Sequence, residues 1–176
     1  MKNIFRLLCL LVFLTAAQSA TAQPKNWTCY TDPEYKLKLC FPKTWGVTDT
    51  IEGARFFIFT PSQSDDNFTE NFNVQAQPTE GQITDLKEYV NLNKAELEKS
   101  IGNYKKYSER YFTQKGVKWY EIVYSGMVES VDFNLRFIQR YSLYKGTAFV
   151  VTYTADGTKK DAFAATAMAI MNTAGF

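Results

Sequence analysis

The hydrophobic positions of this chain alternate with polar ones in several short runs, as they do in strands with one buried face. Residues 35–41 show the clearest alternation. The Asp-Pro-Glu turn before them predicts that residues 27–41 form a hairpin. Pro42 is expected to end this strand because it has no N–H for the ladder, and Trp45 is expected to fill the edge of the core.

Six further strands are predicted along the chain. The first two end at prolines, and the others are separated by turns that contain glycine. The last strand is apolar on both faces, which is typical of a central strand. In order, the six strands cover residues 54–60, 71–77, 104–114, 117–126, 131–144 and 147–154.

Two helices complete the pattern. The first is predicted to begin at Thr84, a suitable N-cap. Its apolar residues recur at helical spacing: Leu86, Val90, Leu97 and Ile101. The second follows Thr158 and Asp161, which form a variant of the capping box. Its apolar stripe consists of Phe163, Ala167, Ile170, Met171 and Ala174.

This order of elements indicates an α+β fold in which an antiparallel sheet has helices packed on it. The sequence contains no internal repeat and no linker long enough to separate two domains. Residues 23–176 are therefore predicted to be a single domain.

Residues 1–22 have the features of a cleavable signal peptide. Lys2 and Arg6 precede a short apolar run over residues 7–17, and the small residues after it predict cleavage before Gln23. The run is shorter than the roughly 20 apolar residues that a membrane-spanning helix needs. The chain is therefore expected to be exported, to the periplasm or to the outside of the cell.

Two alternatives to cleavage are a lipid anchor and an uncleaved segment. A lipid anchor on Cys9 is disfavoured because this residue lies inside the apolar run and not at its end. An uncleaved segment would act as a membrane anchor. Under the favoured interpretation, the mature chain has no stable membrane insertion.

Charge narrows the choice of partners. Cleavage removes Lys2 and Arg6, so the 20 basic residues fall to 18 and equal the 18 acidic ones. A neutral chain argues against nucleic acid as a partner, because nucleic-acid-binding domains usually carry a marked basic excess. Histidine is absent, which excludes Ser-His-Asp catalysis and histidine-ligated metal sites in their usual forms.

The mature chain keeps two cysteines, Cys29 and Cys40, which are predicted to form a disulfide. The hairpin would bring them onto neighbouring strands, and an oxidising compartment favours the bond. A redox pair is the alternative, but the spacing does not match Cys-x-x-Cys. A zinc site is disfavoured because two cysteines without histidine supply too few ligands.

A polar loop supplies the candidate ligand residues. Asp65, Asp66, Asn67 and Glu70 offer several oxygen atoms, which are the ligands that Ca²⁺ prefers. Their spacing differs from that of the EF-hand loop, and a solvated turn explains the same residues. No catalytic residue and no cofactor are predicted.

Glu121 is a carboxylate within an apolar strand. A buried acid is a candidate general acid, but an edge position or a salt bridge to Arg136 or Arg140 is the favoured explanation. The tyrosines present a similar choice between an aromatic binding surface and packing within the sheet, and packing is favoured. They are Tyr104, Tyr107, Tyr111, Tyr120, Tyr124, Tyr141, Tyr144 and Tyr153.

Several motifs, taken in order, resemble one protein family. The opening strand that runs through Phe41-Pro42 to Trp45 resembles the start of the PsbP-like and Mog-like proteins, a family that also includes bacterial DcrB-type exported proteins. The resemblance spans about residues 30–174. Its later pieces are residues 71–74, the helix of 84–101, Gln139-Arg140-Tyr141, residues 146–154 and the last helix.

The resemblance implies an antiparallel β-sheet flanked by α-helices, a PsbP/Mog-like α/β/α sandwich. Members of the family act mainly as accessory or binding proteins, and fold alone does not transfer function. We therefore expect an exported, non-enzymatic accessory or binding protein with an envelope or secreted protein as its partner. An exported enzyme that depends on carboxylates or calcium is the alternative.

Overall fold

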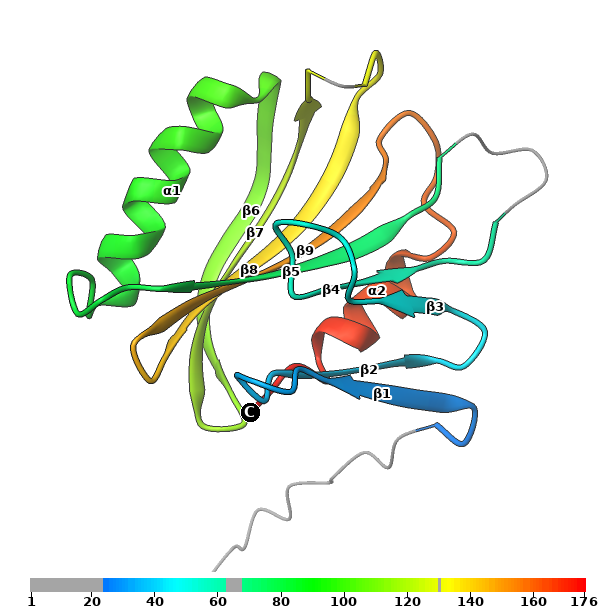
Figure 1. The fold of residues 1–176 in the computed structure, drawn as a ribbon. Helices are drawn as coiled ribbons and strands as arrows, with labels where there is room; N and C mark the ends of the chain where they lie inside the picture. Colours follow the sequence, from blue (N-terminus) through cyan, green and yellow to red (C-terminus); the bar gives the residue numbers. More distant parts are fainter. Residues whose placement is uncertain (1–23, 63–67, 130) are drawn as a thin grey trace, which may run out of the picture.

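A seven-stranded antiparallel sheet forms the centre of the molecule, with the strand order β3-β4-β5-β9-β8-β7-β6 (Figure 1). The computed structural model describes residues 24–62, 68–129 and 131–176, so the predicted signal peptide lies outside the described residues. The strands are β3 (Gly46–Thr48), β4 (Phe56–Phe59), β5 (Asn71–Pro78), β6 (Gly102–Gln114), β7 (Val117–Met127), β8 (Leu135–Tyr144) and β9 (Thr147–Asp156).

The central position of β9 follows from its sequence. This strand pairs with β5 on one side and with β8 on the other. Ala148 and Val150 pack into the core on one face of the sheet, and Phe149 and Val151 pack into the core on the opposite face. A strand that buries both faces must lie inside the sheet. The predicted central strand is therefore confirmed.

Helices cover both faces of the sheet. α1 (Leu86–Ser100) lies against β6, β7 and β8. α2 (Ala164–Met171) lies on the other face, next to a separate two-stranded sheet of β1 (Trp27–Thr31) and β2 (Lys38–Pro42) (Figure 1). The layers are thus α1, the large sheet, and α2 with the hairpin. The predicted α+β fold with an antiparallel sheet flanked by helices is confirmed.

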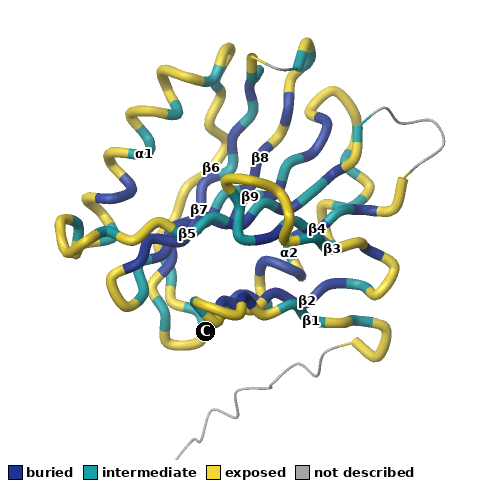
Figure 2. Tube along the Cα trace, in the orientation of Figure 1, coloured by how far each residue is buried: buried dark blue, intermediate teal, exposed yellow. Residues whose placement is uncertain are grey.

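Burial differs between the strands. Figure 2 shows buried residues along β7, β8, β9 and β2, whereas β6 and the outer side of α1 are exposed. On the α2 face, Leu37, Leu39 and Phe41 of the hairpin region are completely or almost completely buried. Trp45 is buried too, and its ring meets the edge of the Phe163 ring with centroids 5.5 Å apart. The hairpin therefore supplies a large part of the core on this face.

The predicted pairing of Cys29 with Cys40 is present. These residues face each other in the β1–β2 register, and their sulfur atoms lie at bonding distance, 2.13 Å. The hairpin is also tied to the segment after α2. The N–H of Cys40 donates to Thr173 Oγ1 at 2.7 Å, and the N–H of Lys38 donates to the carbonyl of Gly175 at 2.8 Å.

A buried arginine joins α2 to the sheet. Arg140 of β8 is completely buried, and its Nε donates to Glu121 Oε2 at 2.7 Å. Its Nη1 donates to the carbonyl of Met171 at 2.6 Å, and its Nη2 donates to Asn172 Oδ1 at 3.1 Å. Burial lowers the pKa of Arg140, and the neighbouring carboxylate of Glu121 opposes this shift. Glu121 thus balances the charge of Arg140, and the end of α2 supplies acceptors for its remaining N–H groups together with Gln114 of β6.

The predicted N-cap of the first helix is wrong by one residue. Asp85, and not Thr84, is the N-cap, because its carboxylate accepts the N–H groups of Lys87 and Glu88 at 2.8 and 3.0 Å. A carboxylate also interacts favourably with the positive end of the helix dipole, which a threonine hydroxyl does less well.

The predicted capping box of the last helix is also wrong, because α2 begins later, at Ala164. Thr158 donates its hydroxyl to Asp156 at 2.6 Å. Asp161 accepts the hydroxyl of Tyr153 at 3.0 Å. Both polar residues therefore stabilise the loop between β9 and α2, and neither caps the helix.

β8 begins at Leu135, four residues later than predicted. The N–H of Val131 bonds to the carbonyl of Val128 at 3.0 Å, so a turn replaces the expected start of the strand. Val131 and Phe133 still pack against the core on the α1 face. The alternation of apolar and polar residues over 131–134 therefore reflects burial of a connecting segment. Over so few residues, this pattern is the same as that of a strand.

We predict that Arg140→Met lowers the free energy of unfolding by about 3 kcal/mol or more, because it leaves the buried Glu121 with fewer partners. The double variant Glu121→Leu/Arg140→Met should recover much of that loss, since it removes both charges together. Urea unfolding of both variants measures this. A double variant that is less stable than Arg140→Met alone would contradict the prediction.

We also predict that replacing both Cys29 and Cys40 by serine lowers the free energy of unfolding by about 3 kcal/mol, because the bond closes a short loop in the unfolded chain. Urea unfolding of the oxidised protein and of the double variant tests this. Reductant should destabilise the wild type and leave the variant unchanged. Equal stability of the two proteins would show that the bond contributes nothing.

Candidate functional site

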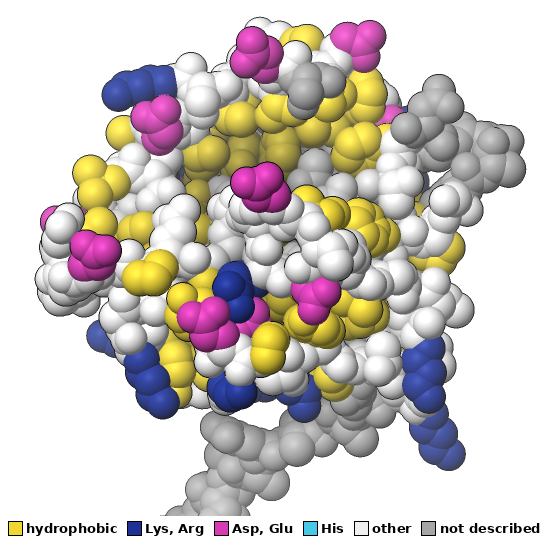
Figure 3. Space-filling model, in the orientation of Figure 1, with side chains coloured by type: hydrophobic (Ala, Val, Ile, Leu, Met, Phe, Trp, Pro, Cys, Tyr) yellow, Lys and Arg dark blue, Asp and Glu magenta, His cyan; other side chains and the backbone are white. Residues whose placement is uncertain are grey.

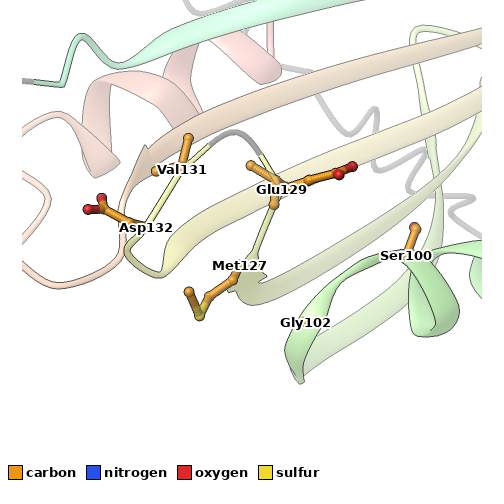
Figure 4. Close-up of a pocket in the computed structure, with 7 residues that line it drawn as sticks. Ser100, Gly102, Met127, Glu129, Val131 and Asp132 are labelled. Carbon is orange, nitrogen blue, oxygen red and sulfur yellow. The ribbon is translucent and has the colours of Figure 1, made fainter.

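An open groove of about 640 Å³ lies at one end of the sheet, next to the end of α1. Its walls come from the α1–β6 junction, the end of β7 and the turn between β7 and β8, as Figure 4 shows. We call it the α1 groove. Its described lining residues are Ser100, Gly102, Met127, Val128, Glu129, Val131 and Asp132.

The two walls meet because a glycine permits close approach. A Cβ on Gly126 would lie 2.2 Å from Cγ2 of Ile101 and 2.8 Å from the carbonyl oxygen of Gly102. Any larger residue would therefore push the end of β7 away from the α1–β6 junction. Asn103 adds a contact, since its amide Nδ2 lies 3.4 Å from the sulfur of Met127.

The groove combines apolar side chains with acidic ones. Met127, Val128 and Val131 are partly buried and provide its apolar surface. Glu129 and Asp132 are exposed, and Figure 4 shows their carboxylates pointing to opposite sides of the turn. Within the part of the chain that the structure describes, neither carboxylate forms an ion pair. The groove therefore suits a partner group that is apolar and positively charged.

Further apolar side chains surround the groove on the α1 face. Figure 3 shows hydrophobic side chains on the floor of a hollow on this side of the molecule. Partly buried residues of the α1 face include Phe68 and Phe133, whose rings meet edge to face with centroids 5.9 Å apart. Leu97, Ile101 and Tyr104 pack against the same core.

One carboxylate holds α1 against the sheet. Glu109 of β6 accepts hydrogen bonds from Lys94 Nζ of α1 at 2.6 Å and from Lys106 Nζ at 2.7 Å. The hydroxyl of Tyr120 also donates to it. Hydrogen bonds from Lys106, Lys94 and Tyr120 lower the pKa of Glu109 from its usual 4.5 to about 2. Burial, together with this carboxylate, raises the pKa of Tyr120.

No protein-family model and no curated protein sequence matches the chain. Several solved structures are similar to the chain. The cyanobacterial PsbP (CyanoP) of Synechocystis sp. PCC 6803 aligns with a TM-score of 0.61 at 11% identity, over 88% of this chain and 95% of its own. The Ran-binding protein Mog1p of Saccharomyces cerevisiae aligns with a TM-score of 0.52 at 11% identity, over 74% of this chain and 77% of its own. The chain has the PsbP/Mog-like fold.

A third similar structure is LpqN of Mycobacterium tuberculosis, which is described as involved in cell envelope biogenesis. It aligns with a TM-score of 0.55 at 17% identity, over 83% of each chain. At such identities, the likeness shows the fold alone. The PsbP/Mog-like resemblance inferred from the ordered motifs is thus confirmed as a statement about fold.

The PsbP/Mog-like sheet places Glu121 in the interior, opposite Arg140 in the β7–β8 register. Of the favoured explanations, the salt bridge to Arg140 is the one present, and Arg110 adds a second one, from its Nε to Glu121 Oε1 at 2.8 Å. Arg136 takes no part, because it lies over the ring of Tyr107.

Packing within the fold accounts for most of the eight tyrosines that were candidates for an aromatic binding surface. Four of the eight are buried, and two more are partly buried. Tyr107 and Tyr111 of the edge strand β6 are exposed, with about half of their surface accessible. The four buried ones are Tyr120, Tyr124, Tyr141 and Tyr153.

The predicted ligand loop is described only in part, since Asp65, Asp66 and Asn67 lie outside the described residues. Glu70 is buried, and its carboxylate accepts the hydroxyl of Thr60 at 3.4 Å. Among the described residues, no group of three or more acidic or cysteine side chains could hold a metal ion. No helix in the described segments is long and apolar enough to cross a membrane.

Sequence reasoning missed the α1 groove. It treated residues 126–130 as a simple turn and residues 131–134 as part of a strand. A signal was present, because Met127, Val128 and Val131 are apolar residues next to carboxylates in a connection between two long strands. Apolar residues in an exposed turn often mark an interaction site.

We predict that the tie between α1 and β6 weakens in acid. Because the pKa of Glu109 is lowered on folding, its stabilising effect is complete above about pH 4.5 and is lost as the pH falls toward 2. Glu109→Gln should be less stable at pH 7 and should lose less stability than the wild type between pH 5 and pH 2. Thermal unfolding across this range measures it. Glu96→Gln, at an exposed position of α1, is the control and should behave like the wild type.

Proposed function

We propose that this chain is an exported, non-enzymatic accessory or binding protein, periplasmic or secreted, which holds an envelope or secreted protein partner in the α1 groove. The observation that carries the proposal is the composition of the groove. It offers an apolar surface beside two carboxylates, Glu129 and Asp132, which form no ion pair with any other described residue. Binding surfaces of this kind recognise a partner by shape and complementary charge.

The chemistry of the groove defines the kind of partner segment. An apolar side chain would pack on Met127, Val128 and Val131. A lysine or arginine next to it would meet the carboxylate of Glu129 or Asp132. We therefore expect a segment of the partner in which an apolar residue is flanked by basic ones.

Two further observations support export. Cys29 and Cys40 lie at disulfide distance, and such bonds persist in oxidising compartments outside the cytosol. The first 22 residues have the features expected of a signal peptide. Among proteins of similar fold, LpqN is described as involved in cell envelope biogenesis, and Mog1p as Ran-binding. No contact among the described residues favours the alternative of a carboxylate- or calcium-dependent enzyme.

Affinity capture with three forms of the mature protein tests the proposal. The groove variant Glu129→Lys/Asp132→Lys reverses both charges of the groove. The control Glu52→Lys/Glu80→Lys makes the same change of net charge at two exposed positions outside the groove. The wild type and the control should retain the same envelope or secreted protein, and the groove variant should retain about tenfold less of it.

The result is decisive only if all three proteins are folded, which thermal unfolding will show. A partner that the groove variant retains as well as the control does would remove the groove from the proposal. A protein that captures nothing from its native envelope or culture fluid in any form would contradict the accessory role itself.

A further inference from the structure

A second cavity, of about 480 Å³, lies on the α2 face of the sheet. It is placed where β8 begins and β9 ends, beneath the loop that leads into α2. Val123 of β7, Ile138 of β8 and Met168 of α2 give it an apolar floor. We call it the α2 cavity. Its volume falls in the range of roughly 300–1,000 Å³ that is typical of small-molecule sites.

The outer wall of the α2 cavity is fixed in place. The N–H of Gly157 bonds to the carbonyl of Asn134 at 2.8 Å. A Cβ on Gly157 would lie 2.8 Å from that carbonyl oxygen, so the loop lies directly on the start of β8. Further along, Asp161 Oδ1 accepts the hydroxyl of Tyr153 at 3.0 Å and the N–H of Phe163 at 2.8 Å.

The rim of the α2 cavity is mainly positive. Arg136, Lys159 and Lys160 line it, and Asp161 is its one carboxylate among the described lining residues. Asp161 already accepts two hydrogen bonds within the protein. Lys159 lies 3.5 Å from the carboxylate of Asp156, so part of its charge is balanced.

Two cations of the rim have no carboxylate partner among the described residues. Arg136 lies over the ring of Tyr107, at 5.1 Å from its centroid, and its guanidinium forms no ion pair among the described residues. Lys160 is exposed and, within the same described segments, has no ion-pair partner either. A positive rim above an apolar floor favours a ligand with the opposite charge and a hydrophobic part.

We propose that the α2 cavity binds a small anionic amphiphile, which carries a carboxylate or a phosphate group on a short apolar chain. The chain lies on Val123, Ile138 and Met168, and the anionic group meets Arg136 and Lys160. This site is independent of the α1 groove, which lies on the other face of the sheet and has the opposite charge.

Binding of four probes to the mature protein tests the proposal. Decanoate and decyl phosphate carry both an anionic group and a chain. Decyl maltoside has the same chain without charge, and inorganic phosphate has charge without a chain. Calorimetry at probe concentrations below micelle formation should detect binding of at least one of the first two. That binding should weaken at high salt, because salt screens exposed charges.

The preference between decanoate and decyl phosphate identifies the anionic group, and either preference supports the proposal. Amide chemical shifts should change around Gly157, Ala164 and Met168, which border the cavity. Equal binding of decyl maltoside would overturn the proposal, as would shift changes confined to other parts of the sheet.

Variants of the rim and of the wall test separately whether binding needs the positive charges and whether it needs the space of the cavity. Arg136→Gln/Lys160→Gln should weaken binding of the anionic probe by about tenfold or more, the size expected for lost hydrogen bonds to charged groups. Lys43→Gln/Lys87→Gln removes two exposed positive charges elsewhere and should leave binding unchanged. Ala164 is exposed and lines the cavity, so Ala164→Trp should block the cavity with a large side chain. If the first two variants bind alike, or if Ala164→Trp binds as the wild type does, the proposal is wrong.

Discussion

The layer formed by α2 and the β1–β2 hairpin depends on one constraint, the buried charge of Arg140. A guanidinium that is removed from water is costly unless every donor finds an acceptor. Glu121 and Gln114 supply acceptors from within the sheet, and Met171 and Asn172 supply two more at the end of α2. The position of α2 is therefore set by hydrogen bonding as well as by apolar packing.

The segment at the end of α2 that binds Arg140 also contacts the hairpin. Thr173, two residues after Met171, accepts the N–H of Cys40 in β2. The disulfide then connects β2 to β1. A chain of short contacts thus runs from the sheet through the end of α2 to the first strands of the domain. The opposite layer is held differently, because α1 is tied by Glu109 at a partly exposed site. A less buried attachment suits the side on which we place the partner.

Alternation of apolar residues predicted the described strands except the short β3, because it depends only on neighbours in the sequence. The sequence favours an edge position for Glu121 or a salt bridge to Arg136 or Arg140. The choice of Arg140 required the register, in which Arg136 faces Ser125 and Arg140 faces Glu121. The apolar turn residues of the α1 groove are visible in the sequence, but the groove itself depends on contacts that the sequence does not show. Its walls lie far apart in the chain, and they meet only because Gly126 lets β7 approach the α1–β6 junction.

The two candidate binding sites share one end of the sheet and differ in sign. The turn before β8 carries Glu129 and Asp132, which line the α1 groove, and the loop after β9 carries Lys159 and Lys160, which line the α2 cavity. Both are connections, which can vary without disturbing the core. Structures of the same fold share only 11–17% of their residues with this chain. A fold that tolerates such divergence is specified by its apolar pattern and leaves its connections free to acquire a function. The function of this chain is therefore to be sought at these two connections, and not in the buried network of Arg140.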